Sequence, residues 1–335
     1  MNRANVTVRA VALAAAVSIV VGLLISWFAW PAKNLAPRDL PVVVGGPAPV
    51  AGTLADKLRA AEPGAFDVST VADAAAADQK LRDRQAYAAF VVDASGVSLH
   101  TASGASPTVA ALLSAAATQI GPAGQAITVV DVVPGSPDDP RGTGFAAGYL
   151  PQVLAGIIAG VLFTLLIASA YARLLGLVLA AAFVGLVGAG VLQIMGVLNG
   201  AYLATAGAAA LVALATSATV AGLAAVIGRA GIALGVLVVF AFGNPISGVA
   251  AAPQLLPKPW GEVGQFLPPG AGATLLRSAA FFDGAGGGAA LWTLIAWSVV
   301  GLALVSIGRR SNHLTRAEGR AAPSPATSTA SATAD

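Results

Sequence analysis

The longest uncharged stretch of the chain reads LLGLVLAAAFVGLVGAGVLQIMGVLNGAYLATAGAAALVALATSATVAGLAAVIG. It occupies residues 174–228, between Arg173 and Arg229. A helix that crosses a bilayer needs about 20 mostly apolar residues, so this stretch is long enough for two crossings. Asn199-Gly200 lies near its middle and is a typical turn sequence. The stretch therefore predicts a hairpin of two membrane helices.

Four other uncharged segments predict further membrane helices on either side of this hairpin. They are residues 10–30, 142–172, 230–250 and 284–308. The first of them ends in aromatic residues rather than at a small-residue cleavage site, so we expect an uncleaved anchor and not a signal peptide. Together the segments predict a polytopic α-helical membrane protein with six transmembrane helices.

The composition supports a membrane protein. Only 10% of the 335 residues are charged and 57% are hydrophobic, whereas a soluble domain usually spends about 25% of its residues on charge. The basic excess behind the pI of about 9.5 lies at the ends of apolar segments, so we expect membrane lipid and no nucleic acid as a partner. The absence of cysteine excludes disulfides, zinc–thiolate sites and cysteine nucleophiles.

Short-loop charges predict the orientation, because cytoplasmic loops carry an excess of Lys and Arg. With the N-terminus inside, eight arginines fall on the cytoplasmic side, opposed there only by Glu318 and Asp335. They are Arg3, Arg9, Arg173, Arg229, Arg309, Arg310, Arg316 and Arg320. We therefore expect a multi-pass protein of the plasma membrane with both termini in the cytoplasm.

Residues 31–147 are the most polar part of the chain and alternate between strand-like and helical patterns. The strand-like segments are 40–44, 66–71, 88–93 and 126–133, and the helical ones are 54–61, 73–86 and 106–120. Such alternation is typical of α/β domains, and about 110 residues can form an independent core. We expect a small extracytoplasmic α/β domain between the first and second membrane helices, with an Asp78–Arg82 pair and with His100 on its surface.

Residues 251–283 contain five prolines, so no single helix can cover them. Two short amphipathic segments, 260–266 and 271–282, predict a helical hairpin that dips into the outer leaflet. We expect Arg277 to extend to the headgroups, with Glu262 and Asp283 as its possible partners. The hairpin is then either a structural cap over the bundle or a gate. The expected parts of the chain are thus 1–30, 31–147 and 148–308, followed by a disordered cytoplasmic tail at 309–335.

The predicted membrane helices contain no Asp, Glu, Lys, Arg or His. Proton- and ion-coupled carriers usually place such residues within the membrane, so autonomous ion coupling is not expected. The chain has no phosphate-binding Gly-x-x-x-x-Gly-Lys motif, and His100 and His313 are expected on opposite sides of the membrane. We therefore expect no enzyme, no catalytic residues, no metal site and no cofactor.

Polar residues in or near the predicted helices are candidates for a substrate path or its gate. They are Asn244, Pro245, Arg277, Gln152 and Gln193. The amides can either line a path or form hydrogen bonds between helices. Asn244-Pro245 can mark either a helix end or a kink where the path opens.

Three pairs of glycines have the small-xxx-small spacing that permits close helix contact. They are Gly156–Gly160, Gly196–Gly200 and Gly231–Gly235.

Several short motifs resemble one membrane-protein family. They are GNPISG (243–248), LLP (255–257), FLPPGAG (266–272), LLR (275–277), FFDG (281–284) and, upstream, LRDRQAYAA (81–89), TAS (101–103) and DDPRG (138–142). This part of the chain is similar to ABC-transporter permeases of the second, exporter type, in the phage-infection-protein-like branch. The resemblance implies one helix, an outer domain and five further helices, and a separate ATPase subunit that contacts a cytoplasmic segment between the second and third helices. Here that link is only Tyr171-Ala172-Arg173, which leaves an ATPase little to bind.

Two functions follow as hypotheses. The first is a permease-like export subunit, working as a homodimer, that moves a hydrophobic or amphipathic compound outward. The second is a non-transporting cell-envelope protein whose extracytoplasmic domain binds a partner while the helices anchor it.

Overall fold

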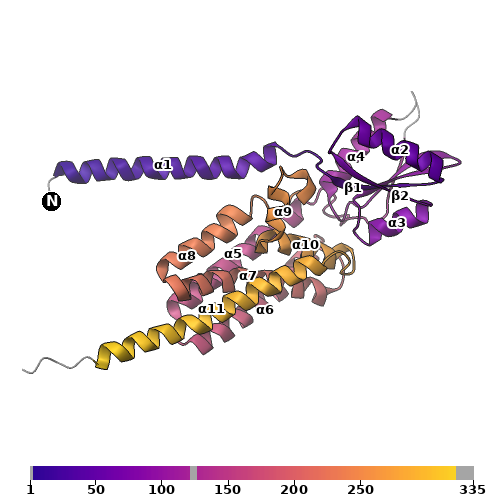
Figure 1. The fold of residues 1–335 in the computed structure, drawn as a ribbon. Helices are drawn as coiled ribbons and strands as arrows, with labels where there is room; N and C mark the ends of the chain where they lie inside the picture. The colour runs from indigo at the N-terminus through magenta and orange to yellow at the C-terminus, as the bar shows by residue number, and fades with distance from the viewer. Residues whose placement is uncertain (1–2, 121–126, 322–335) are drawn as a thin grey trace, which may run out of the picture.

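The computed structural model describes residues 3–120 and 127–321 of the chain. A long N-terminal helix, an α/β domain and a helical bundle follow one another along the sequence (Figure 1). Within these ranges, five helices are long and apolar enough to cross a membrane: α1 (Arg3–Lys33), α5 (Thr143–Leu166), α6 (Ala170–Ile194), α7 (Tyr202–Ile227) and the first part of α11 (Gly288–Ala321). These helices confirm the prediction of a polytopic helical membrane protein. The hairpin predicted for residues 174–228 consists of α6 and α7.

The segment predicted as a fifth crossing, residues 230–250, is shorter than expected. It forms α8 (Arg229–Val236) and a π-helical turn, η1 (Leu237–Gly243), after which the chain turns. Fifteen helical residues extend about 22 Å at about 1.5 Å each, against about 30 Å of bilayer hydrocarbon. The second half of this prediction is therefore wrong, because Pro245 provides no backbone N–H to continue the helix.

Helix α7 lies at the centre of the bundle and is the most buried of the apolar helices. Glycines on the neighbouring helices allow them to approach α7 closely. A Cβ atom at Gly156 of α5 would overlap Thr216 Oγ1, and one at Gly160 would lie 2.7 Å from Ser217 O. The predicted close contact is confirmed for Gly156–Gly160.

The other two glycine pairs differ from each other. Gly231 and Gly235 of α8 also pack against α7, as predicted. Gly196–Gly200 does not mediate packing between α6 and α7, although a Cβ atom at Gly200 would lie 2.7 Å from Ala279 O of α10. Both glycines have positive φ (69° and 81°) and form the turn between α6 and α7, so that prediction is wrong.

The α/β domain contains a five-stranded sheet, in the order β2-β1-β3-β4-β5. Its strands are β1 (Leu40–Gly45), β2 (Phe66–Val71), β3 (Ala88–Asp93), β4 (Gly96–Thr101) and β5 (Thr128–Asp131). Neighbouring strands are parallel except for the antiparallel pair β3–β4. Helices α2 (Ala48–Ala61) and α4 (Pro107–Ile120) pack on one face, and α3 (Ala74–Arg82) packs on the other.

The side chains of β1 alternate between the two faces of the sheet, as the pleat requires. Val42 and Val44 join the cluster under α2 and α4, whereas Val43 joins the cluster under α3. Because β1 and β3 are buried on both faces, they have continuous apolar sequences, and they were predictable for that reason.

Strand β4 is absent from the sequence-based prediction, because it carries polar residues on one face. Its His100 is half-buried, and His100 Nδ1 lies 2.6 Å from Asp78 Oδ1, so the expected surface position of His100 is wrong. The predicted Asp78–Arg82 pair is confirmed at 4.0 Å. Strand β5 is shorter than the predicted strand 126–133, of which Ala126 lies outside the described residues.

The two predicted short helices are present as α9 (Trp260–Gln265) and α10 (Pro268–Phe281), preceded by a 3₁₀ turn, η2 (Pro253–Leu255), and their position in the outer leaflet stays a prediction. The pair of helices will be called the α9–α10 hairpin. Helix α11 continues to Ala321, so the predicted disorder is wrong for the first part of the tail. Residues 322–335 lie outside the described part of the chain.

The α/β domain shares a core with the residues that flank the α9–α10 hairpin and with Phe281 at the end of α10. Ala251, Ala252 and Leu255 belong to the cluster under α2 and α4, and Phe282 belongs to the cluster under α3. Backbone hydrogen bonds add to this contact, since Ala36 N donates to Leu255 O at 3.0 Å.

Helix α1 extends away from the bundle along most of its length (Figure 1), and its apolar span is unburied. Near its C-terminal end, Trp27 stacks on Phe242 at 5.2 Å and meets Trp260 edge-on at 5.0 Å. These rings attach α1 to η1 and to the α9–α10 hairpin.

Candidate functional site

An apolar groove of about 710 Å³ runs between α5 and α6 and is open along one side. Its α5 wall includes Gly148, Pro151 and Gln152, and its α6 wall includes Phe183, Val187 and Gly188. Pockets of about 300–1,000 Å³ are typical of small-molecule sites. The groove is therefore large enough for a drug-sized or lipid-like molecule, and it will be called the α5–α6 groove.

Gln152 is the main polar side chain in this groove. It is 5% exposed and lies against Gly188 of α6. Its Oε1 and Nε2 atoms are both buried without a hydrogen-bond partner among the described residues. A buried polar group left without a partner costs about 1–3 kcal/mol, so a ligand that supplies a hydrogen bond here would recover part of that cost.

Pro151 adds a second polar feature to the groove. It lies inside α5 and has no N–H, so the helix leaves the carbonyl of Ala147 without its usual partner. Ala147 also lines the groove. The α5 wall thus presents an amide and a carbonyl on an otherwise apolar surface.

Gln193 lies outside the groove. Its Nε2 donates to Gly200 O and to Thr205 Oγ1, both at 3.2 Å. These bonds fasten the end of α6 to the start of α7. For this residue the structure supports the interhelical hydrogen-bond interpretation rather than a path lining.

Asn244 and Pro245 lie at a helix end rather than at a kink. Ser247 Oγ donates to Asn244 O at 2.7 Å, and this bond closes the turn that follows η1. Val249, just beyond the turn, accepts a hydrogen bond from Arg277 Nη2 at 2.8 Å. Of the five candidate residues, Asn244, Pro245 and Arg277 are therefore brought to one region, whereas Gln152 and Gln193 lie elsewhere.

The expectation that Arg277 extends to lipid headgroups is wrong. Its side chain is 5% exposed, and its guanidinium lies 4.5 Å from the centre of the Phe145 ring. Within the described residues, neither Glu262 nor Asp283 forms an ion pair with it. Burial, and then the charge of Arg84, lower the pKa of Arg277 to about 10, so it remains charged at neutral pH.

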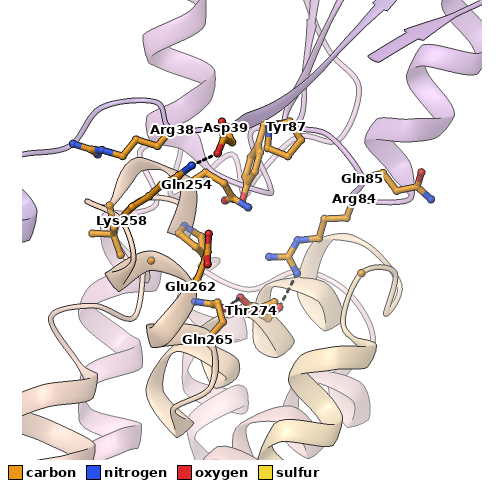
Figure 2. A pocket seen from close by; sticks show the side chains of 15 residues that line it. Arg38, Asp39, Arg84, Gln85, Tyr87, Gln254, Lys258, Glu262, Gln265 and Thr274 are labelled. Carbon is orange, nitrogen blue, oxygen red and sulfur yellow. Dashed lines mark hydrogen bonds and ion pairs between the residues drawn. The ribbon is translucent and has the colours of Figure 1, made fainter. Parts of the chain in front are cut away.

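A second, polar pocket of about 370 Å³ lies between the α/β domain and the α9–α10 hairpin (Figure 2). It will be called the junction pocket. Tyr87 lies directly before β3, and its hydroxyl donates a hydrogen bond to Gln254 Oε1 at 2.9 Å. Thr274 Oγ1 donates to Gln265 Oε1 at 2.7 Å. No sequence pattern predicts this pocket, because its two walls are more than 150 residues apart in the chain.

Comparison of the chain with family models, curated proteins and solved structures found no match in any of the three. The resemblance to exporter-type permeases therefore stays a prediction drawn from the motifs alone.

Proposed function

We propose that this chain is a permease-like membrane subunit that takes up a hydrophobic or amphipathic compound from the bilayer and moves it outward. The observation that carries the proposal is the α5–α6 groove with the unpartnered amide of Gln152. An amphipathic molecule fits both features, because its chain can lie on the apolar walls while its polar group bonds the amide. Homodimer formation stays a prediction.

The position of the groove supports entry from lipid. Phe183, Val187 and Met195 line it and are each 63% exposed, which places large apolar side chains at its open side. In a bilayer this side would face acyl chains. Gly144 and Gly148, in the first turns of α5, place the groove near the end of the bundle that follows the α/β domain.

Six crossings are part of the proposal. The α/β domain shares a core with the residues that flank the α9–α10 hairpin, so the domain and the hairpin lie on the same side of the membrane, and an even number of crossings separates them. Helices α5, α6 and α7 provide three of these crossings. The proposal therefore makes α8–η1 the fourth crossing, although it is only 15 residues long. Its glycines pack along α7, so α8 returns beside that helix.

The link between α5 and α6 offers little surface for an ATPase. It comprises only residues 167–169, since Tyr171, Ala172 and Arg173 belong to α6. The Arg173 guanidinium donates to the α5 carbonyls of Phe163 and Thr164 and, at 2.7 Å, to the carbonyl of Ile167 in the link. The proposal therefore places no ATPase contact at this link.

Binding of a dansyl-labelled dodecyl amide to the full chain in detergent tests the proposal. We expect Gln152→Leu to weaken binding about two- to tenfold, because one hydrogen bond contributes about 0.5–1.5 kcal/mol net. Val187→Trp should abolish binding by filling the groove. Gln193→Leu and Val178→Trp are the matched controls, because neither residue lines the groove, and both should bind normally.

Efflux of the same probe from proteoliposomes then tests transport. We expect efflux with the native chain and none with Val187→Trp. If Val187→Trp binds and exports the probe like the native chain, the groove is not the substrate site. Binding without efflux would favour the second candidate, a non-transporting envelope protein, for which the junction pocket provides a ligand site.

A further inference from the structure

Three charged side chains of the junction pocket, Arg38, Arg84 and Glu262, have no ion-pair partner among the described residues, and the last two are opposite in charge. Arg84 follows α3 of the α/β domain, and Glu262 lies in the first turn of α9. Figure 2 shows them reaching into the pocket from its two sides. The pair is more than 4.0 Å apart, since no salt bridge joins them.

The other charged side chains that line the pocket already have hydrogen-bond or ion-pair partners. Arg38 donates to three backbone carbonyls, those of Asn34, Ala36 and Leu255, at 2.7–3.0 Å. Lys258 forms an ion pair with Asp39. A ligand would therefore be recognised by Arg84 and Glu262.

Arg84 is held in place with most of its donors unused. Its backbone adopts a positive φ of 58°, and its N–H donates to Leu81 O at 3.0 Å. Nη1 donates to Thr274 O at 2.7 Å, which accounts for one of the five donors of a guanidinium.

The Arg84 guanidinium lies 5.4 Å from the centre of the Phe282 ring, but it has no carboxylate partner among the described residues. Burial lowers its pKa, and the nearby Arg277 is a second buried cation without a carboxylate partner among the described residues. Of these two cations Arg84 lines the junction pocket, and it favours an anion there. Arginine is well suited to such a site, because it binds carboxylates and phosphates through paired hydrogen bonds.

We propose that the junction pocket binds a small zwitterion, whose anionic group contacts Arg84 and whose ammonium group contacts Glu262. The pocket volume of about 370 Å³ suits a small molecule, and Gln254 and Gln265 offer amides beside the two charges. The site is separate from the α5–α6 groove. Either a free zwitterion or the phosphoethanolamine headgroup of a lipid has this chemistry.

Calorimetric titration of the full chain in a neutral detergent with O-phosphoethanolamine tests the proposal. We expect saturable binding that Arg84→Gln and Glu262→Gln each weaken at least tenfold. Inorganic phosphate and ethanolamine, which carry only one of the two charges, should bind at least tenfold more weakly than the zwitterion.

Arg82→Gln and Glu62→Gln are the matched controls, since both residues are exposed and lie outside the pocket; they should leave binding unchanged. Glu262 is itself exposed, so Glu262→Gln stays informative even if Arg84→Gln fails to fold. Absence of binding, or binding that Glu262→Gln does not weaken, would overturn the proposal.

Nanodiscs distinguish the two sources of the headgroup. Phosphatidylethanolamine nanodiscs should compete with O-phosphoethanolamine if a lipid is the occupant, and phosphatidylglycerol nanodiscs should not. Equal binding in both kinds of nanodisc identifies a free zwitterion.

Discussion

At the scale of single residues, the absence of a side chain controls the packing of the bundle. Gly156 of α5 faces Thr216 and Ala213 of α7, and a Cβ atom there would overlap Thr216 Oγ1 and lie 2.9 Å from Ala213 O. The close contact of α5 and α7 therefore depends on glycine. The same contact supports the α5–α6 groove, because Gln152 lies one helical turn from Gly156.

We expect Gly156→Ala to destabilise the protein by about 1–3 kcal/mol, as overpacking of a closely packed core does. Thermal melting of the purified protein measures this as a lower melting temperature. Gly207→Ala on α7 is the matched control, because a Cβ atom there meets nothing within 4 Å. Alanine at an open helical site should be neutral or should stabilise by about 0.5–1 kcal/mol. Equal melting temperatures for the two variants would contradict the inference that the α5–α7 contact depends on glycine at position 156.

At the scale of elements, a short irregular segment connects the two halves of the molecule. Leu255, in η2, is 1% exposed and packs among residues of β1, α2 and α4. Its carbonyl also accepts hydrogen bonds from Ala36 N and from Arg38 Nη1. The position of the α9–α10 hairpin, and with it the junction pocket, therefore depends on this segment.

Leu255→Ala should cost about 2–5 kcal/mol, the range for a buried leucine whose removal leaves a cavity. It should also weaken binding of O-phosphoethanolamine at the junction pocket. Leu112→Ala on α4 is the control, since Leu112 is partly exposed and surface changes usually stay within about 0.5 kcal/mol. Chemical denaturation of both variants provides the comparison, and similar midpoints would show that the shared core adds little stability.

At the scale of the whole molecule, the proposed six crossings put the α/β domain and the α9–α10 hairpin on one side of the membrane and the α5–α6 link on the other. The chain has no cysteine, so single introduced cysteines report on one position each. Ser69 in β2 and Ala168 in the α5–α6 link are exposed and suit this experiment.

We expect an impermeant thiol reagent to label Ser69→Cys in intact cells. It should label Ala168→Cys and His313→Cys only after the cells are permeabilised, because the arginines near these positions favour the cytoplasmic side. Labelling of Ala168→Cys in intact cells would contradict the proposed orientation. Labelling of Ser69→Cys and His313→Cys together, without permeabilisation, would contradict the five crossings that the proposal places between these two positions.

Features that depend mainly on neighbouring residues were predictable from the amino-acid sequence. The apolar runs of α5, α6 and α7 predicted membrane helices, because a bilayer demands about 20 apolar residues whatever their partners. Strands β1 and β3 were predictable because burial on both faces makes them continuously apolar. The short helices of the hairpin followed from the positions of its prolines.

Which polar groups are paired depends on how distant segments of the chain pack together. Arg277 appeared suited to the lipid interface, but α10 packs it against Phe145 and the carbonyl of Val249. Gln152 and Gln193 looked equivalent in sequence, and only the packing of α5 against α6 leaves Gln152 unpartnered. The junction pocket joins Arg84 to Thr274 across the chain. Such pairings depend on contacts between distant segments, which hydrophobic periodicity does not encode.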